Sequence, residues 1–153
     1  MIEHLLTSET CEILRLSQHA AVRANNSSIT PENLLQGLVS FGAGEGKNFN
    51  VLAFLHLSYH QFVGVFNEFK DDKEPFNVSL VSVGTPPSSR TFHVFQEATF
   101  YAQRQGRPYA RAEDLLYALA LPRINGIDSR TYHILGRLGV STASIEELMR
   151  KKV

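Results

Sequence analysis

Glycines and a lysine gather in the segment FGAGEGKNF, residues 41–49, and raise the question of nucleotide binding. A phosphate-binding loop has the spacing G-x-x-x-x-G-K-[ST], because successive amides cradle the phosphates and a hydroxyl holds magnesium. Here Phe41 stands five residues before Gly46, and Asn48 replaces the hydroxyl. The residues before the segment have a helical period, whereas a phosphate loop follows a buried strand. We therefore predict that Lys47 binds no nucleotide and that the glycines connect two helices.

Other side chains could in principle do metal or acyl-transfer chemistry. His56 and His60 stand four residues apart, the spacing of a metal-binding pair on one helix face. No third ligand is near, and the glutamate of H-E-x-x-H is missing. Cys11 and the pair Ser17/His19 lack an acid and an oxyanion donor. We expect no catalytic residue, no metal and no cofactor; the alternative is a small helical metal-dependent hydrolase, which stoichiometric metal in the purified protein would reveal.

The composition is that of an ordinary soluble domain. The 153 residues are 43% hydrophobic and 20% charged, which is enough for one core without a metal or disulfide. A single cysteine suits a reducing compartment, and no signal peptide or membrane-spanning run is visible, so we expect a cytoplasmic protein. The basic cluster at 104–111 is followed at once by the acidic residues 113 and 114, so neither nucleic acid nor a membrane is an expected partner.

Two stretches of the chain are similar to each other. TCEILRLSQHAAVRANNSSITPENLLQGL (10–38) aligns with TFHVFQEATFYAQRQGRPYARAEDLLYAL (91–119) at an offset of 81 residues. Further on, LAFLHLS (52–58) aligns with LGRLGVS (135–141) at an offset of 83. Such internal similarity indicates a duplicated structural unit.

Each half carries signals for four helices. Thr7 and its counterpart Ser88 are placed to cap the first helix, and Thr-Pro-Glu at 30–32 begins the second. A short third helix is expected around 50–57, and a capping box at 58–61 begins the fourth. Apolar or small residues of the first helix recur with a helical period, at 13, 14, 17, 20, 21 and 24. The sequence therefore predicts an all-α fold.

The boundaries follow from a polar, proline-containing segment between the halves. We expect the first repeat at 1–70, a linker at 71–87 with an extended piece at 78–83, and the second repeat at 88–153. One half could not bury its apolar face alone. The two four-helix repeats should therefore pack about a pseudo-two-fold axis as one eight-helix domain.

This order of signals resembles the Clp N-terminal repeat, the double domain at the front of Clp-type AAA+ unfoldases. The helix at 30–38 is similar to the family's second helix, Gly-Glu-Gly at 44–46 falls at its loop, and LGVS at 138–141 matches the end of a repeat. The ATPase modules of the unfoldases are not in this sequence. The resemblance implies a module, not an enzyme, that recognises client or adaptor proteins for a Clp unfoldase and its protease. It is either the N-domain of a longer unfoldase or a free-standing accessory protein that docks on the Clp machine.

Two glutamates occupy equivalent places, Glu32 and Glu113, in the first turns of equivalent helices. One interpretation is that each only complements the helix dipole. The resemblance implies more, because in unfoldase N-domains of the ClpC type the matching glutamates help bind basic or phosphorylated-arginine groups of clients. We therefore expect two matched acidic sites on the surface of a domain that is monomeric in isolation. The expected client-binding or adaptor-binding residues are Glu32, Glu113, Thr30 and Arg111.

Overall fold

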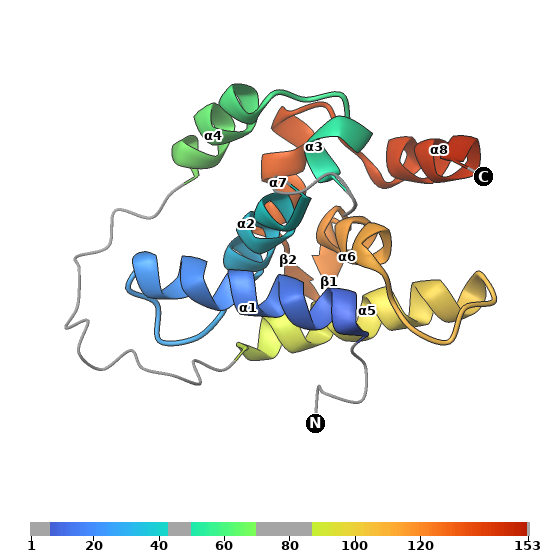
Figure 1. Cartoon of the computed structure of the whole chain (residues 1–153), viewed down its shortest axis with the longest axis horizontal. Coiled ribbons are helices and arrows are strands. Elements are labelled where there is room, and N and C mark those ends of the chain that lie inside the picture. Colours follow the sequence, from blue (N-terminus) through green and yellow to red (C-terminus); the bar gives the residue numbers. More distant parts are fainter. Residues whose placement is uncertain (1–6, 43–49, 70–86, 153) are drawn as a thin grey trace.

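The computed structural model describes residues 7–42, 50–69 and 87–152, and these residues are mostly helical (Figure 1). The first repeat forms α1 (Ser8–Arg23), α2 (Pro31–Gly42), α3 (Val51–Phe54) and α4 (Tyr59–Glu68). The second repeat forms α5 (Ser89–Arg104), α6 (Ala112–Leu119), α7 (Arg130–Arg137) and α8 (Thr142–Lys152). The predicted all-α fold with two four-helix repeats is therefore confirmed. Lys47, the Gly-Glu-Gly segment and nearly all of the expected linker lie outside the described residues, so the repeat boundaries stay a prediction.

Local side chains begin the helices as predicted. Thr7 and Ser88 each accept a backbone N–H of the first turn, at 3.2 Å in both cases. Ser58 accepts the N–H of Gln61 at 3.0 Å, and the Gln61 side chain accepts the N–H of Ser58 at 2.8 Å, which completes a capping box. These bonds satisfy amides that a helix start otherwise leaves without a partner.

A short antiparallel hairpin interrupts the helices between α6 and α7. It consists of β1 (Arg123–Ile124) and β2 (Ile127–Asp128). Asn125 and Gly126 form its turn with φ values of 52° and 77°, the left-handed conformations that a two-residue turn of this kind requires. This hairpin was not among the predicted elements, although Asn-Gly is its usual signal in a sequence.

One hydrophobic core joins the two repeats. Helix α2 lies near the middle of the molecule, with α1 beside it and α6 and α7 close by (Figure 1). Its residues Leu34, Leu35 and Leu38 are fully buried in one cluster with Leu115 and Leu116 of α6. Each repeat therefore completes the burial of the other, as expected for a repeat too small to form a core alone.

The loop before α2 is also bonded to the start of the second repeat. The Ile29 carbonyl oxygen accepts the N–H of Ser88 at 2.9 Å and the hydroxyl of Thr91 at 2.7 Å. Ile29 is 2% exposed and forms a parallel bridge with Pro87. The first turn of α5 is thus held by a residue of the other repeat.

Equivalent turns in the two repeats use different residues for the same left-handed backbone. His56 has φ 58° where its counterpart Gly139 has φ 80°, and Asn25 has φ 61° where Gly106 has φ 83°. This conformation costs an ordinary L-residue about 1–2 kcal/mol, and asparagine tolerates it better than histidine does. The connection between α3 and α4 is therefore strained at His56.

We predict that His56→Gly raises the free energy of unfolding by about 0.5–1 kcal/mol. The change removes left-handed strain from an exposed side chain, and the greater freedom of glycine in the unfolded chain offsets part of the gain. Urea unfolding measures the difference. Asn25→Gly is the matched control and should change stability much less. A loss of stability in His56→Gly would contradict the prediction.

Candidate protein-binding site at the start of α2

Reciprocal bonds fix the first turn of α2. The Thr30 hydroxyl accepts the N–H of Asn33 at 3.2 Å, and the Asn33 side-chain oxygen accepts the N–H of Thr30 at 3.0 Å. Pro31 at the first helical position needs no N–H partner and has a φ that suits the helix. Glu32 follows, so its carboxylate stands at the positive end of the helix dipole.

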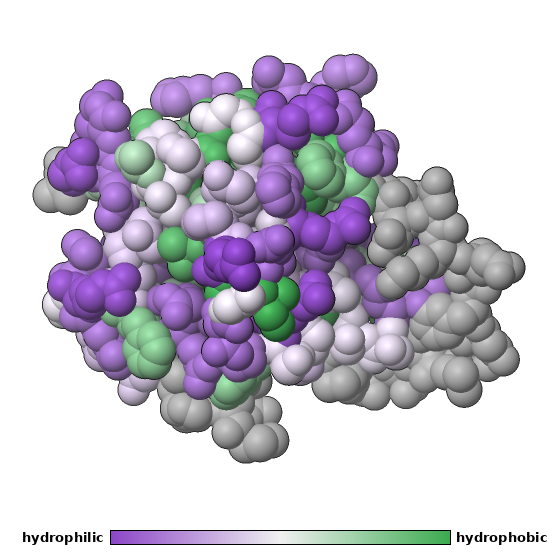
Figure 2. Space-filling view, turned by 180° about the vertical axis from the view of Figure 1, so that it is seen from behind, coloured by the Kyte–Doolittle hydropathy of each residue, from purple (hydrophilic) through white to green (hydrophobic). Residues whose placement is uncertain are grey.

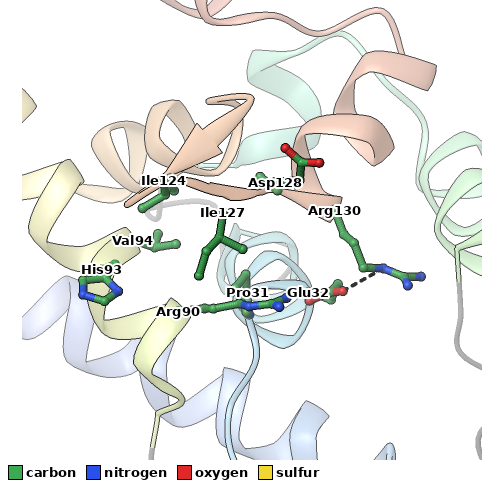
Figure 3. A pocket seen from close by; sticks show the side chains of 10 residues that line it. Pro31, Glu32, Arg90, His93, Val94, Ile124, Ile127, Asp128 and Arg130 are labelled. Atoms are coloured by element: carbon green, nitrogen blue, oxygen red, sulfur yellow. Dashed lines mark ion pairs between the residues drawn. The ribbon is translucent and has the colours of Figure 1, made fainter.

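The Glu32 carboxylate is already engaged by a guanidinium of the second repeat. Arg130, the first residue of α7, places its Nε 3.0 Å from Glu32 Oε2, as the dashed line in Figure 3 marks. The same guanidinium donates to the carbonyl oxygen of Phe69. The Glu32 side chain is 26% exposed and that of Arg130 is 41% exposed, so solvent reaches both. The start of α2 therefore holds an arginine in a partly open site.

Glu113 corrects the expectation of two matched acidic sites. It is 3% exposed, and its neighbours Ala112 and Asp114 are fully buried. The start of α6 is covered by α1, whose Glu9 side chain accepts the N–H of Ala112 at 2.7 Å. The expected exposed site at Glu113 is therefore wrong, because an element distant in sequence packs over that helix start. Arg111 precedes it with an exposed side chain.

A charged pair fixes the first turn of α6. Arg107 donates from one guanidinium nitrogen to Asp114 Oδ1 at 2.8 Å and from the other to Oδ2, and the N–H of Arg111 donates to Oδ2 at 2.8 Å. The Asp114 side chain is fully buried, whereas that of Arg107 is 23% exposed. The hydrogen bonds to Asp114 raise the pKa of Arg107. Asp114 is therefore both the cap of α6 and the anchor of the preceding turn.

The first repeat builds the same junction from neutral groups. Asn26 stands where the second repeat has Arg107, and Asn33 stands where it has Asp114. The Asn26 amide donates to the Asn33 side-chain oxygen at 2.9 Å. The two repeats therefore join equivalent positions, by two charged hydrogen bonds in the second repeat and by one neutral hydrogen bond in the first.

A pocket adjoins Glu32, and we name it the α2–α5 pocket. It lies between the start of α2, the first turns of α5 and the β1–β2 hairpin, and it is open to solvent (Figure 3). Glu32 is a residue that the sequence predicts for this site, whereas Arg130 and Arg90, which also line the pocket, are not. Both arginines come from the other repeat, and no local pattern places them beside α2.

The side chains considered as metal ligands or nucleophiles do not form a common site. His56 precedes the Ser58 cap of α4, and His60 lies within that helix, so the two do not share a helix face. Among the residues that the structure describes, no three histidine, cysteine, aspartate or glutamate side chains gather as metal ligands would. Ser17 is buried and donates its hydroxyl to the Ile13 carbonyl at 2.7 Å, whereas His19 is exposed.

A comparison of the sequence with known protein families identifies the family of this chain. The sequence matches the Clp repeat (R) N-terminal domain over residues 5–127, which is most of the chain. The chain belongs to the Clp repeat N-terminal domain family. In Clp ATPases this domain is a non-catalytic N-terminal module. Two copies of the repeat account for the paired caps and paired left-handed turns of this Clp N-terminal domain.

Solved structures share the fold of this Clp N-terminal domain at low sequence identity. The N-terminal domain of the chaperone ClpD from Arabidopsis thaliana is 18% identical with a TM-score of 0.70, and the match covers 100% of this chain and 98% of that one. The Hsp104 N-terminal domain from Candida albicans is 17% identical with a TM-score of 0.68, covering 94% and 87% of the two chains. The N-terminal domain of the ClpV1 ATPase from E. coli is 18% identical with a TM-score of 0.62, covering 96% and 85%.

No curated protein matches the sequence significantly. In the described ranges, none of the helices has both the length and the apolar character needed to cross a membrane.

Proposed function

We propose that this Clp N-terminal domain binds client or adaptor proteins for a Clp ATPase and its protease. The observation that carries the proposal is the ion pair of Glu32 and Arg130, in which a partly exposed carboxylate at a helix start lies 3.0 Å from a guanidinium nitrogen. A carboxylate can take two parallel N–H bonds from a guanidinium, so arginine is its best partner. An arginine of a client segment would exchange with Arg130 at the same carboxylate.

The proposed site is centred on Glu32 and depends on the residues around it. Thr30 is a positioning residue, because its hydroxyl and its N–H fix the turn that carries Glu32. Glu113 is left out because it is buried, at a helix start that Glu9 of α1 contacts. Arg111, with its side chain exposed at the start of α6, would repel a basic segment and so limit such segments to the α2 side.

We predict that Glu32→Gln weakens binding of an acetylated, amidated peptide with two arginines by about fivefold or less, since partly exposed ion pairs contribute under about 1 kcal/mol. Arg130→Gln should tighten binding by a similar factor, because it removes the competing guanidinium. Both effects should shrink at high salt. NMR titration of the ¹⁵N-labelled chain measures the affinities, and the melting temperature should change little for Glu32→Gln.

The chain provides a matched control for that experiment. Glu68 of α4 pairs with Arg137 of α7 at 2.6 Å, another ion pair between the repeats, and both side chains are about half exposed. Glu68→Gln should leave peptide binding unchanged. A peptide with citrulline in place of arginine keeps the shape and loses the charge, so it should bind more weakly than the arginine peptide and should not distinguish the parent from Glu32→Gln. Equal binding by the parent and Glu32→Gln would refute the role of Glu32.

The same function fits two arrangements of the protein. The domain would be the front module of a longer unfoldase, or a free-standing accessory protein that docks on the Clp machine. The natural reading frame distinguishes them, since a continuation with ATP-binding motifs supports the first arrangement. Co-purification with a separately encoded Clp ATPase supports the second.

A further inference from the structure

The floor of the α2–α5 pocket is aliphatic. Val94 of α5 is buried at its base, Ile124 of β1 is half-buried, and Ile127 of β2 is 42% exposed. In Figure 3 the Ile127 side chain extends into the space between Val94 and Pro31. A partner's aliphatic side chain placed there would remove this surface from water, which favours binding.

Each acid at the rim of the pocket is already paired with an arginine, and one arginine of the lining, Arg90, remains. Glu32 pairs with Arg130 at 3.0 Å, and Asp128 pairs with Arg123 at 3.3 Å, so each acid has a cation. Arg90 lines the pocket with an exposed side chain and makes no ion pair or hydrogen bond with any residue in the described ranges. Its guanidinium is therefore available to a carboxylate from outside.

The start of α6 is equivalent to the start of α2, and it has an acid where the α2–α5 pocket has Arg90. Arg90 is the counterpart of Glu9, and Pro31 is the counterpart of Ala112, at the same offset of 81 residues. Glu9 accepts the N–H of Ala112 at 2.7 Å, so the chain supplies its own acid there. In the α2–α5 pocket the acid is replaced by a base and the amide by a proline. Among the residues that the structure describes, none supplies an acid to Arg90 in this pocket, which leaves its guanidinium for a carboxylate of a partner.

We infer that the α2–α5 pocket binds a protein segment in which an aliphatic residue is followed by glutamate or aspartate. The aliphatic side chain covers Val94 and Ile127, and the carboxylate takes parallel bonds from Arg90. The inference rests on the proposed function in that the chain binds protein segments. It names a different recognition residue and a partner of opposite charge to the one that Glu32 would take.

The test uses the full ¹⁵N-labelled chain and short acetylated, amidated peptides in a Gly-Ser background. A Leu-Glu peptide should shift the amide signals of Arg90, Ile124 and Ile127. Replacing its glutamate by glutamine should weaken binding by about threefold or more, up to about fivefold for a solvent-exposed charge pair. Replacing its leucine by alanine should weaken binding about tenfold, as loss of buried aliphatic surface predicts.

Protein variants assign the effect to the pocket. Arg90→Gln should abolish the preference for the glutamate peptide over the glutamine peptide. Arg150→Gln removes an exposed arginine of α8 that does not line the pocket, and it should leave that preference intact. Equal binding of the two peptides by the parent chain, or a preference that survives in Arg90→Gln, would overturn the inference.

A Leu-Arg peptide separates this inference from the proposed function. Binding of Leu-Arg alone, lost in Glu32→Gln, overturns the inference and supports the proposed function. Binding of Leu-Glu alone supports the inference and refutes the role of Glu32. Binding of none of the peptides overturns both.

Discussion

Replacing Asp114 by alanine should lower the free energy of unfolding by about 3 kcal/mol. Its carboxylate is fully buried, holds both guanidinium nitrogens of Arg107 and caps α6 through the N–H of Arg111. Removing one partner of a buried pair costs about 3–5 kcal/mol, because the other charge is left uncompensated. Since Arg107 is 23% exposed and can turn toward water, we expect the lower end of that range. Urea unfolding at neutral pH measures the loss.

The first repeat supplies the control for this experiment. The double change Arg107→Asn with Asp114→Asn copies the neutral pair of Asn26 and Asn33, which stands at the equivalent positions. It should cost less than Asp114→Asn alone, because no unpaired guanidinium remains. If the double variant loses the sum of the two single losses, the charges are not coupled and the explanation fails.

Replacing Gly37 by alanine should cost about 2–3 kcal/mol. Gly37 lies where α2 passes against α1, and an added Cβ would stand 2.7 Å from the backbone nitrogen of Ser17 and 2.8 Å from the carbonyl oxygen of Ile13. Backbone atoms cannot turn away as a side chain can, so the helices must separate, and overpacking of this kind costs about 1–3 kcal/mol. Thermal and urea unfolding of Gly37→Ala measure the effect.

Two further changes test that explanation. Gly64 of α4 has open space where a Cβ would lie, so Gly64→Ala should stabilise the protein by about 0.5–1 kcal/mol. Ser17→Ala should not rescue Gly37→Ala, because the close backbone atoms remain. In the second repeat the equivalent positions are the buried residues Ala118 and Ala98, where a methyl group fits. A stabilising effect of Gly37→Ala would refute the close approach.

Features that depend on neighbouring residues could be predicted from the sequence. The caps at Thr7, Thr30, Ser58 and Ser88 are local, because a side-chain oxygen reaches an amide three residues ahead. Because the two halves align at a constant offset, a helix start predicted in one half could also be predicted at the equivalent position of the other. The helical fold followed from these signals and from the period of the apolar residues.

The candidate site was only partly predictable, because its surroundings come from distant segments. Glu32 and Glu113 have the same local context, yet one pairs with Arg130 and the other is buried. Nothing in the first turn of a helix specifies what packs above it. The opposite charges of Glu9 and Arg90 were visible in the aligned repeats. Their effect became clear only once each was seen beside the helix start of the other repeat.

The bonds from Ile29 to Ser88 and Thr91, together with the shared core, make each repeat a structural subunit for the other. In energetic terms the two repeats of this one chain interact as the two protomers of a dimer would, except that they are covalently linked. The tether keeps their effective concentration high, so the interface need not be strong enough to hold two free proteins together. The two copies are thereby free to diverge in sequence wherever their contact surface is preserved. One copy could therefore acquire an ion pair and a buried glutamate while the other kept an amide pair and an open pocket.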